Sequence, residues 1–259
     1  MNAVESMTSQ FTNPPATLKR QPQGRRWASV LVVLGAWSVI APASAQAPST
    51  QRISQSLTAA RAEIQLVTTV VRLDIGEGSS GNLIDGTLDL GRDDRLDRTF
   101  STRGDTQVVR LAARQVRRIF NFNTLNHDPA RWQVQLSPKV PLILKIETGV
   151  GESFLNLEGL KVTNLSLKVG VGMATVHLPA TGTVAASITG GVGQITVRIP
   201  RGVQARIQAQ SGLGAVNVLG DFKHEGNVYT SSGHAGASNR VDLQIKGGVG
   251  QITVEQAAR

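Results

Sequence analysis

The acidic side chains in the second half of the chain are too scattered to form a catalytic pair. Enzymes that hydrolyse glycosides usually place two carboxyl groups on either side of the scissile bond. No two acids after residue 144 fall at equivalent positions of neighbouring 21-residue repeats. General acid–base hydrolysis therefore has no evident site, and we predict a protein that is not an enzyme. These acids are Glu147, Glu152, Glu158, Asp221, Glu225, Asp242 and Glu255.

The histidines do not have the spacing of metal ligands. They are His127, His177, His224 and His234. The last two lie near acids in a stretch that interrupts the repeats, so a metal or catalytic site there is an alternative to the favoured interpretation as polar loop residues. The chain has no cysteine, which excludes disulfides and thiolate metal sites. We expect no metal and no cofactor.

Nine arginines lie between residues 92 and 131 and carry most of the excess positive charge. The candidate binding residues are Arg110, Arg114, Arg117 and Arg118, which alternate with apolar residues. They would face an anionic polymer or lipid headgroups. We favour the alternative that this segment is a hydrated cap over one end of the repeats, because repeat proteins need capping units. Residues 92–131 are thus predicted to be an irregular, Arg-rich flank or cap.

Residues 1–45 have the pattern of a secretory signal peptide. A basic region precedes an uncharged apolar run over 27–41, and Ala-Ser-Ala closes it at 43–45. We predict cleavage between Ala45 and Gln46, with an uncleaved membrane anchor as the alternative. The polar segment 46–66 is predicted to be a linker that ends in a short helix over 58–66. The protein is thus expected in the periplasm, the cell envelope or the extracellular space.

The 259-residue chain has a formal charge of +9, with 27 Lys and Arg against 18 Asp and Glu. A basic chain favours an anionic partner. The signal region accounts for a third of this excess, however, and export argues against nucleic acid. We therefore expect no nucleic acid partner. The scarcity of aromatic residues, 4% of the chain, also argues against surfaces that stack sugars or bases.

A glycine motif recurs along the chain and indicates how the elements are arranged. Its first glycine stands at 149, 170, 191 and 212, a period of 21, and further copies follow and precede this series. We predict that these glycines form corners where stacked backbones approach closely. The predicted corner glycines are Gly76, Gly78, Gly149, Gly151, Gly170, Gly172, Gly191, Gly193, Gly212, Gly214, Gly248 and Gly250.

Apolar residues alternate with polar ones on both sides of each corner, which is typical of strands with one buried face. A straight strand of 21 residues would be about 70 Å long, so each repeat must turn. Coils stacked in chain order would bring Asn156, His177, Arg198 and Leu219 into one column and Glu147, Lys168, Thr189 and Gln210 into another. We predict a single all-β domain over 67–256, with regular repeats over 132–256. An ordinary β-sandwich is the alternative.

These segments resemble the toast-rack proteins, bacterial β-repeat domains of unknown function that include the C-terminal domain of LiaF-type proteins and are related to adhesin-head repeats. The resemblance covers about residues 68–256 and rests on the glycine repeats, the opening VRLDIGEG (71–78), WQVQLSP (132–138) and the closing LQIKGGVGQITV (243–254). It implies a right-handed β-helix-like stack outside the cytoplasm, without established enzymatic activity. The chain lacks the multiple membrane spans of LiaF-type proteins, which puts a role in their signalling pathway in doubt.

We therefore predict an exported, non-enzymatic envelope or surface protein that presents its β-repeat surface for binding, adhesion or envelope-stress response. The expected partner is an envelope component or protein of unknown identity. Two alternatives stay open: a carbohydrate-active β-helix enzyme that acts on cell-wall polysaccharide, and a polyanion-binding protein that uses the Arg-rich segment. Steep salt dependence of binding would distinguish the second of these.

Overall fold

The computed structural model describes residues 49–79, 81–91, 94–115 and 130–257. The predicted signal peptide, its cleavage site at Ala45 and Gln46, and the candidate residues Arg117 and Arg118 lie outside these ranges. Within them, no helix is long and apolar enough to cross a membrane. The unit described here falls within residues 44–259.

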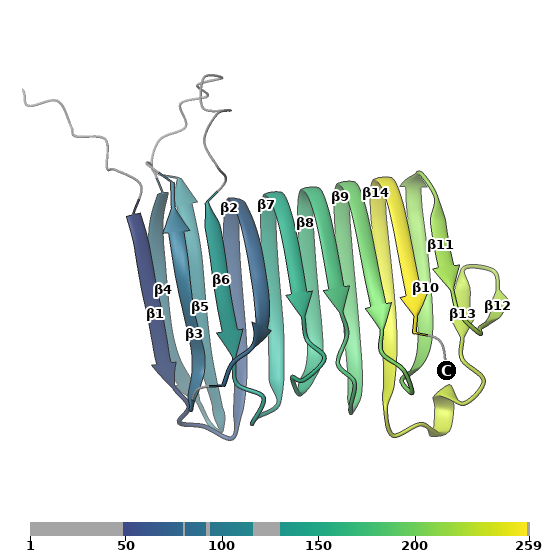
Figure 1. Cartoon of the computed structure of the whole chain (residues 1–259), viewed down its shortest axis with the longest axis horizontal. Helices are drawn as coiled ribbons and strands as arrows, with labels where there is room; N and C mark the ends of the chain where they lie inside the picture. Colours follow the sequence, from purple (N-terminus) through teal and green to yellow (C-terminus); the bar gives the residue numbers. More distant parts are fainter. Residues whose placement is uncertain (1–48, 80, 92–93, 116–129, 258–259) are drawn as a thin grey trace, which may run out of the picture. The chain divides into compact units, whose positions relative to one another are not determined.

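The repeats form long strands that bend at their glycine motif. The strands are β7 (Leu142–Asn156), β8 (Val162–His177), β9 (Thr183–Ile199) and β14 (Arg240–Gln256), and each pairs in parallel with the next along nearly its whole length. Figure 1 shows each strand running along one layer, turning, and returning along the other. We call the segments before the bend the first layer and those after it the second layer. The prediction of an all-β stack of coils is confirmed.

The two layers enclose one apolar core. Side chains at alternate positions point inward in each layer, so that buried Leu, Ile and Val repeat along every strand. Trp132 is 1% exposed within this core, and its Nε1 donates a hydrogen bond of 3.2 Å to the Asp89 carbonyl oxygen. Without a disulfide, the stack is stabilised chiefly by this continuous burial.

At the N-terminal end of the stack, the coil of β2 (Arg61–Glu77) is completed by separate strands. Its first half pairs in parallel with β5 (Thr106–Gln115), which pairs antiparallel with β4 (Asp94–Arg103). Its second half pairs in parallel with β6 (Arg131–Leu136), followed by β3 (Asn82–Leu90) and β1 (Ser49–Ser56), both antiparallel. The first layer therefore ends in β4 and the second layer in β1 (Figure 1).

Two sequence predictions for this end are wrong. Residues 46–66 were expected to form a linker with a short helix over 58–66, but β1 and the start of β2 occupy this range. The polar sequence of β1 reflects an edge strand with few buried positions, of which Ile53 is one at 3% exposed. Residues 92–131 were expected to be irregular, yet their described part contains the regular β4–β5 ladder and the start of β6.

The C-terminal strand β14 lies between two strands that precede it in the sequence. Its first-layer half pairs with β9 on one side and β10 (Gln204–Leu213) on the other, and its second-layer half lies between β9 and β11 (Val216–Leu219). The octapeptide GGVGQITV occurs at 190–197 and again at 247–254, so that eight identical residues pair in register. Beyond β10, the sheet ends in β13 (Val228–Thr230) and β12 (Lys223–Glu225), and the 3-10 helix η2 (His234–Gly236) precedes β14.

This insertion corrects the predicted columns. Coils do not stack in chain order after β9, so Glu255 stands between Arg198 and Leu219, and Lys246 stands between Thr189 and Gln210. The 21-residue period is real, but it does not determine which coil is the spatial neighbour.

The glycine corners form a column in which each coil lies close to its neighbour. A Cβ atom added to Gly193 would lie 2.8 Å from the carbonyl carbon of Gly172 and closer still to its oxygen, and Gly193 has a φ of +135°. Close approach and positive φ therefore both require glycine here. The column consists of Gly149 and Gly151, Gly170 and Gly172, Gly191 and Gly193, Gly248 and Gly250, and Gly212 and Gly214.

The prediction that Gly76 and Gly78 are corners of the same column is wrong. Register pairs Val71 with Gly151 and Thr68 with Thr148, so the corner of β2 is at Thr69 and Val71. In the later coils the equivalent residues are glycines, and a Cβ added to them would collide with the backbone of the neighbouring coil. Among the described residues, none pairs with the corner of β2 on the side away from β7, because the ladders with β5 and β6 cover only residues 61–67 and 72–77. β2 has Thr69 and Val71 at this corner in place of glycines.

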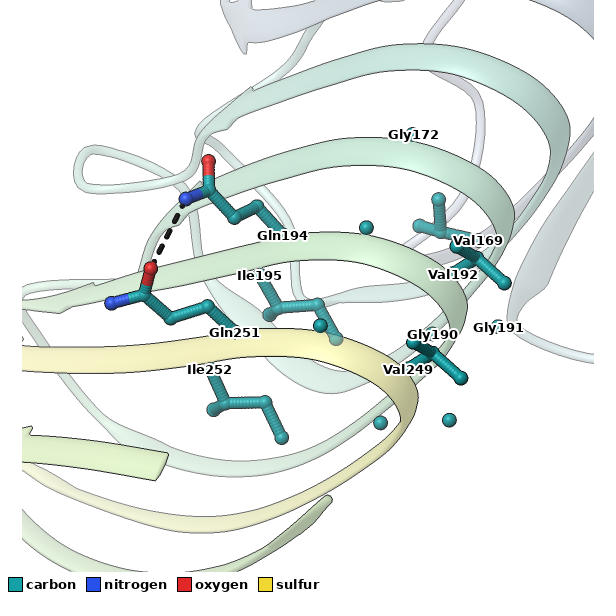
Figure 2. A pocket seen from close by; sticks show the side chains of 14 residues that line it. Val169, Gly172, Gly190, Gly191, Val192, Gln194, Ile195, Val249, Gln251 and Ile252 are labelled. Carbon is teal, nitrogen blue, oxygen red and sulfur yellow. Dashed lines mark hydrogen bonds between the residues drawn. The ribbon is translucent and has the colours of Figure 1, made fainter. Parts of the chain in front are cut away.

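Inside the corner, the sizes of two side chains compensate. In β9 the inward position before the bend is Gly190, and a Cβ there would lie 2.7 Å from Cδ1 of Ile195, the inward residue after the bend. In β8 the equivalent residues are Val169 and Ala174. Figure 2 shows Ile195 and Ile252 extending into the space enclosed by the bend. A large residue on one side thus requires a small residue on the other.

Candidate binding groove

Two of the four candidate arginines lie on one face of β5. Arg110 donates a hydrogen bond of 3.1 Å to the side-chain oxygen of Gln65, and Arg114 forms an ion pair of 2.8 Å with Asp97 of β4. Register places Arg95 opposite Arg114, so that three arginines share the outer side of the β4–β5 ladder. Arg117 and Arg118 lie outside the described residues.

The same layer contains a carboxyl group with a shifted pKa. Lys145 of β7 lies 2.6 Å from Glu63 of β2, and Gln65 also donates a hydrogen bond to this carboxylate. The hydrogen bond from Lys145 is the largest cause, followed by that from Gln65, and together they hold the pKa of Glu63 below its ordinary value. Glu63 thus joins the first coil to the second and does not have the raised pKa of a general acid.

The two histidines of the interrupting stretch contact different groups. His224 stacks on Tyr229 with ring centroids 4.3 Å apart, and its Nε2 lies 2.6 Å from the Gly226 carbonyl oxygen. His234 Nε2 lies 3.4 Å from a carboxylate oxygen of Asp242, without the alignment of a hydrogen bond. Among the residues that the structure describes, no three His, Cys, Asp or Glu side chains are grouped as metal ligands.

The outer side of the second layer contains a groove that the sequence analysis missed. Two rows of outward-facing residues run across its strands from β1 to β14. The first row is Arg52, Thr87, Gln133, Asp74, Phe154, Thr175, Thr196 and Thr253. The second row is Ser54, Asp85, Gln135, Gly76, Asn156, His177, Arg198 and Glu255. The rows bring together residues from distant parts of the sequence.

Gly76 opens the groove because it has no side chain in the middle of the second row. A Cβ at this position would meet no atom within 4 Å. The resulting hollow has a volume of about 720 Å³, and its borders include Gln133, Gln135, Phe154 and Asn156. The glycine that the sequence analysis assigned to a structural corner thus forms the floor of a surface depression.

Phe154 separates this hollow from a second one. The second hollow has a volume of about 470 Å³ and extends over Arg72, Glu152, Met173 and Thr175. The Phe154 side chain is 41% exposed, and its ring contacts His177 edge-on with centroids 5.3 Å apart. Met173 beside it is 47% exposed. An apolar ring therefore stands between two polar depressions, held in place by its neighbour.

The charged residues around Asp74 are paired. Asp74 accepts a hydrogen bond of 2.9 Å from Arg131 Nε, and Arg131 Nη2 lies at 2.9 Å from the same oxygen. Arg72 approaches Asp74 at 3.7 Å and Glu152 at 3.5 Å. Because two guanidinium groups neutralise Asp74, this carboxylate is suited to orienting a ligand rather than to abstracting a proton.

This set of groups can bind but has no evident arrangement for bond cleavage. The amides of Gln133, Gln135 and Asn156 can donate and accept hydrogen bonds with hydroxyl groups. The exposed Phe154 ring offers an apolar face for a sugar ring or an apolar side chain. The only signal in the sequence was an aromatic residue at an outward position, in a chain with few aromatics.

Comparisons with known proteins agree with the coil architecture. Residues 42–198 match the family described as the N-terminal domain of toast_rack, DUF2154. No curated protein matches the chain.

Solved structures with a similar fold exist. One is a "putative cell adhesion protein" from Clostridium sporogenes ATCC 15579, with 24% identity and a TM-score of 0.73 over 81% of this chain and all of that chain. This match shows the same fold. A "putative adhesin" from Bacteroides fragilis NCTC 9343 covers 80% of this chain and 96% of its own at 12% identity, but its TM-score of 0.28 does not indicate a shared fold.

Proposed function

Because the chain belongs to the toast-rack family, we propose that it is an exported envelope or surface protein whose coil surface binds a partner without catalysis. The basic region, the apolar run and the Ala-Ser-Ala site at 43–45 support export. The description of the similar Clostridium protein as a "putative cell adhesion protein" is consistent with a surface role.

The groove around Phe154 is the surface that we assign to the partner, and the exposed ring beside the hollow over Gly76 is the observation that supports this choice. An apolar ring flanked by amides and by a neutralised carboxylate matches the chemistry of a glycan, which presents apolar ring faces and many hydroxyl groups. We therefore propose an oligosaccharide of the cell wall or of a neighbouring surface as the ligand class.

Two variants test this binding site. Phe154→Ala removes the ring, and Gly76→Val adds a side chain to the floor of the hollow, where an added Cβ meets no atom within 4 Å. The control is Phe100→Ala, which removes a ring that is 44% exposed on β4, in the other layer. The probes are an oligosaccharide array and soluble peptidoglycan fragments, applied to the mature protein isolated after export.

We expect at least tenfold weaker binding for both groove variants and unchanged binding for the control. If the array shows a ligand whose affinity is the same for wild type, Phe154→Ala and Gly76→Val, the groove is not the binding site. If no oligosaccharide or peptidoglycan fragment binds the wild type at millimolar concentration, the glycan assignment is wrong.

Export is tested separately by cell fractionation and N-terminal sequencing. We expect the protein outside the cytoplasm, with Gln46 at its new N-terminus. Recovery of the uncleaved chain from the cytoplasm would overturn the proposed location, whatever the groove binds.

A second candidate function is polyanion binding by the outer side of the β4–β5 ladder, favoured by Arg95, Arg110 and Arg114 on one face. Asp97 neutralises part of this charge through its ion pair with Arg114. Binding to a heparin column that weakens steeply with salt, and that is lost in Arg110→Gln/Arg114→Gln, would support this candidate. Unchanged elution of the double variant would exclude it.

A further inference from the structure

An exposed row of aliphatic side chains runs along the corner of the stack. It consists of the residue between the two corner glycines in each coil and of its equivalent in β2. We call this row the aliphatic ridge, and its members in spatial order are Val70, Val150, Val171, Val192, Val249 and Leu213. The valines are 47–50% exposed and Leu213 is 70% exposed. Exposed apolar residues that adjoin in this way commonly mark interaction sites.

Columns without side chains lie on both sides of the ridge. Gly170 and Gly172 flank Val171, and Gly191 and Gly193 flank Val192. Figure 2 shows Val192 and Val249 on the outer side of the bend, away from the enclosed Ile195 and Ile252. The ridge is therefore one side chain wide. Its members repeat at the strand spacing of about 4.8 Å.

We propose that the aliphatic ridge is the contact between two copies of this chain, which pack antiparallel about a two-fold axis between Val171 and Val192. A second copy offers the same ridge with the same spacing. The two-fold axis places the two ridges directly against each other, with Val171 opposite Val192 and Val150 opposite Val249 of the other copy. Such an interface is isologous, because the same patch contacts itself.

The charges beside the ridge favour the antiparallel arrangement. In the first layer, the neighbouring column contains Glu147 of β7 and Lys246 of β14, which are equally far from the proposed axis. The two-fold rotation therefore places Glu147 of each copy opposite Lys246 of the other. A parallel arrangement would instead bring Glu147 of β7 towards Glu152 of the same coil in the other copy, and like charges repel.

The ridge is a small contact, which suits a weak dimer. Its six side chains are 47–70% exposed and by themselves do not reach the total of about 1,000 Å² that specific interfaces bury. The charged columns beside the ridge add to the contact. A lipid surface is less well matched, because the carboxylates of Glu147 and Glu152 also stand beside the ridge and would face anionic headgroups.

The first experiment measures mass against concentration by analytical ultracentrifugation of the mature protein isolated after export. We expect a monomer–dimer equilibrium. Val171→Lys/Val192→Lys places like charges at the axis and should raise the dimer dissociation constant at least tenfold. The matched control, Ser166→Lys/Ser187→Lys, adds the same charge on the outer side of the same two strands and should leave it within twofold.

A charge exchange tests the orientation. Lys246→Glu should weaken the dimer because it opposes Glu147 of the other copy, and the double variant Glu147→Lys/Lys246→Glu should restore it. In a parallel dimer, Lys246→Glu alone would leave association unchanged, because residue 246 would then face the uncharged Gln251 of the other copy. Circular dichroism and thermal unfolding of each variant establish that the fold is retained.

Cysteine pairs provide a second readout, because the chain has no native cysteine. Val150→Cys/Val249→Cys should give covalent dimers on mild oxidation, while Val150→Cys alone should not. Residues 150 and 249 are three strands apart within one copy, about 14 Å, which is too far for an internal disulfide. A crosslink with the single variant would indicate the parallel arrangement and overturn the proposed one.

A mass that stays monomeric up to several hundred micromolar would overturn the proposal. Flotation of a monomeric protein with phosphatidylglycerol vesicles, abolished by Val171→Lys/Val192→Lys, would assign the ridge to a lipid surface instead. A dimer that persists unchanged in the lysine variant would place the contact elsewhere.

Discussion

The corner of β2 pairs in register with the corner of β7 but has different residues from the corners of the later coils. β2 turns at Thr69, Val70 and Val71, whereas β9 turns at Gly191, Val192 and Gly193. The later coils lie against a preceding coil, whose carbonyl oxygens occupy the space where a Cβ would be. The glycines are therefore required by the neighbouring coil, and not by the bend alone.

The side-chain contacts between neighbouring coils also differ between the first coil and the later coils. β2 is joined to β7 by ion pairs, namely Glu63 with Lys145 and Arg72 with Glu152. β9 is joined to β14 by eight identical uncharged residues, with a hydrogen bond of 3.2 Å between the side-chain amides of Gln194 and Gln251, and by one ion pair of 3.5 Å between Arg198 and Glu255. Ion pairs thus occur in both ladders, but only β9 and β14 also match residue for residue through the corner.

The largest loss of stability is expected where a substitution causes both a collision with the neighbouring coil and backbone strain. A control with backbone strain alone separates the two causes. Gly193→Ala introduces both a positive φ for a side chain and a collision with the Gly172 backbone. We expect a loss of about 3–5 kcal/mol in the free energy of unfolding, or a failure to fold. Gly182→Ala is the control, because Gly182 has a φ of +88° but open space around it, and should lose about 1 kcal/mol. Equal losses in urea unfolding would show that stacking does not require the glycine column.

The next largest effect is expected when the two inward residues at the corner of β9 are replaced by those of β8. Gly190→Val should lose about 1–3 kcal/mol, because the new side chain collides with Ile195. Gly190→Val/Ile195→Ala reproduces the Val169 and Ala174 pair of β8 and should recover most of this loss. A double-mutant cycle by urea unfolding measures the coupling. Additive losses would contradict the compensation of sizes.

A smaller effect depends on pH and concerns the first coil. The pKa of Glu63 is lower in the folded chain than in the unfolded chain, so its ion pair stabilises the fold above the unfolded pKa of about 4.5. This contribution is lost as the pH falls through the folded pKa. Glu63→Gln should lower stability by about 1 kcal/mol at pH 7 and by less at pH 3. Urea midpoints at both pH values check this, and an equal deficit at both would refute it.

The smallest effect is expected for the amide ladder. Gln251→Ala removes an exposed hydrogen bond to Gln194 and should lower stability by about 0.5 kcal/mol, independently of pH. A thermal unfolding series from pH 4 to 8 provides the measurement. A deficit that grows across this range would show that charge contributes to the β9–β14 ladder.

The glycine spacing and the alternation of apolar and polar residues predicted the coils well, because both patterns lie within one short segment of the chain. They did not predict the order of the coils, since a constant 21-residue period does not determine which coil lies beside which. The repeated octapeptide at 190–197 and 247–254 was the available signal, because identical corners fit each other best.

The groove and the aliphatic ridge were missed for different reasons. Gly76 resembled the corner glycines in the sequence, and only the register of β2 with β7 shows that it faces outward in the second layer. The ridge valines would be inward by strict alternation, because Thr148 and Ile146 on the same strand are buried. The bend at Gly149 and Gly151 interrupts the alternation and turns Val150 outward.

The central place of β14 also bears on how the chain is made. Synthesis proceeds from the N-terminus, so the strand that separates β9 from β10 is made after both of them. Until residues 240–256 are available, β9 and β10 lack the partner that lies between them. The stack can therefore close only after β14 has been synthesised. Under the export proposed above, such a delay would keep the earlier coils incomplete, and so competent for transport as an extended chain, until β14 follows.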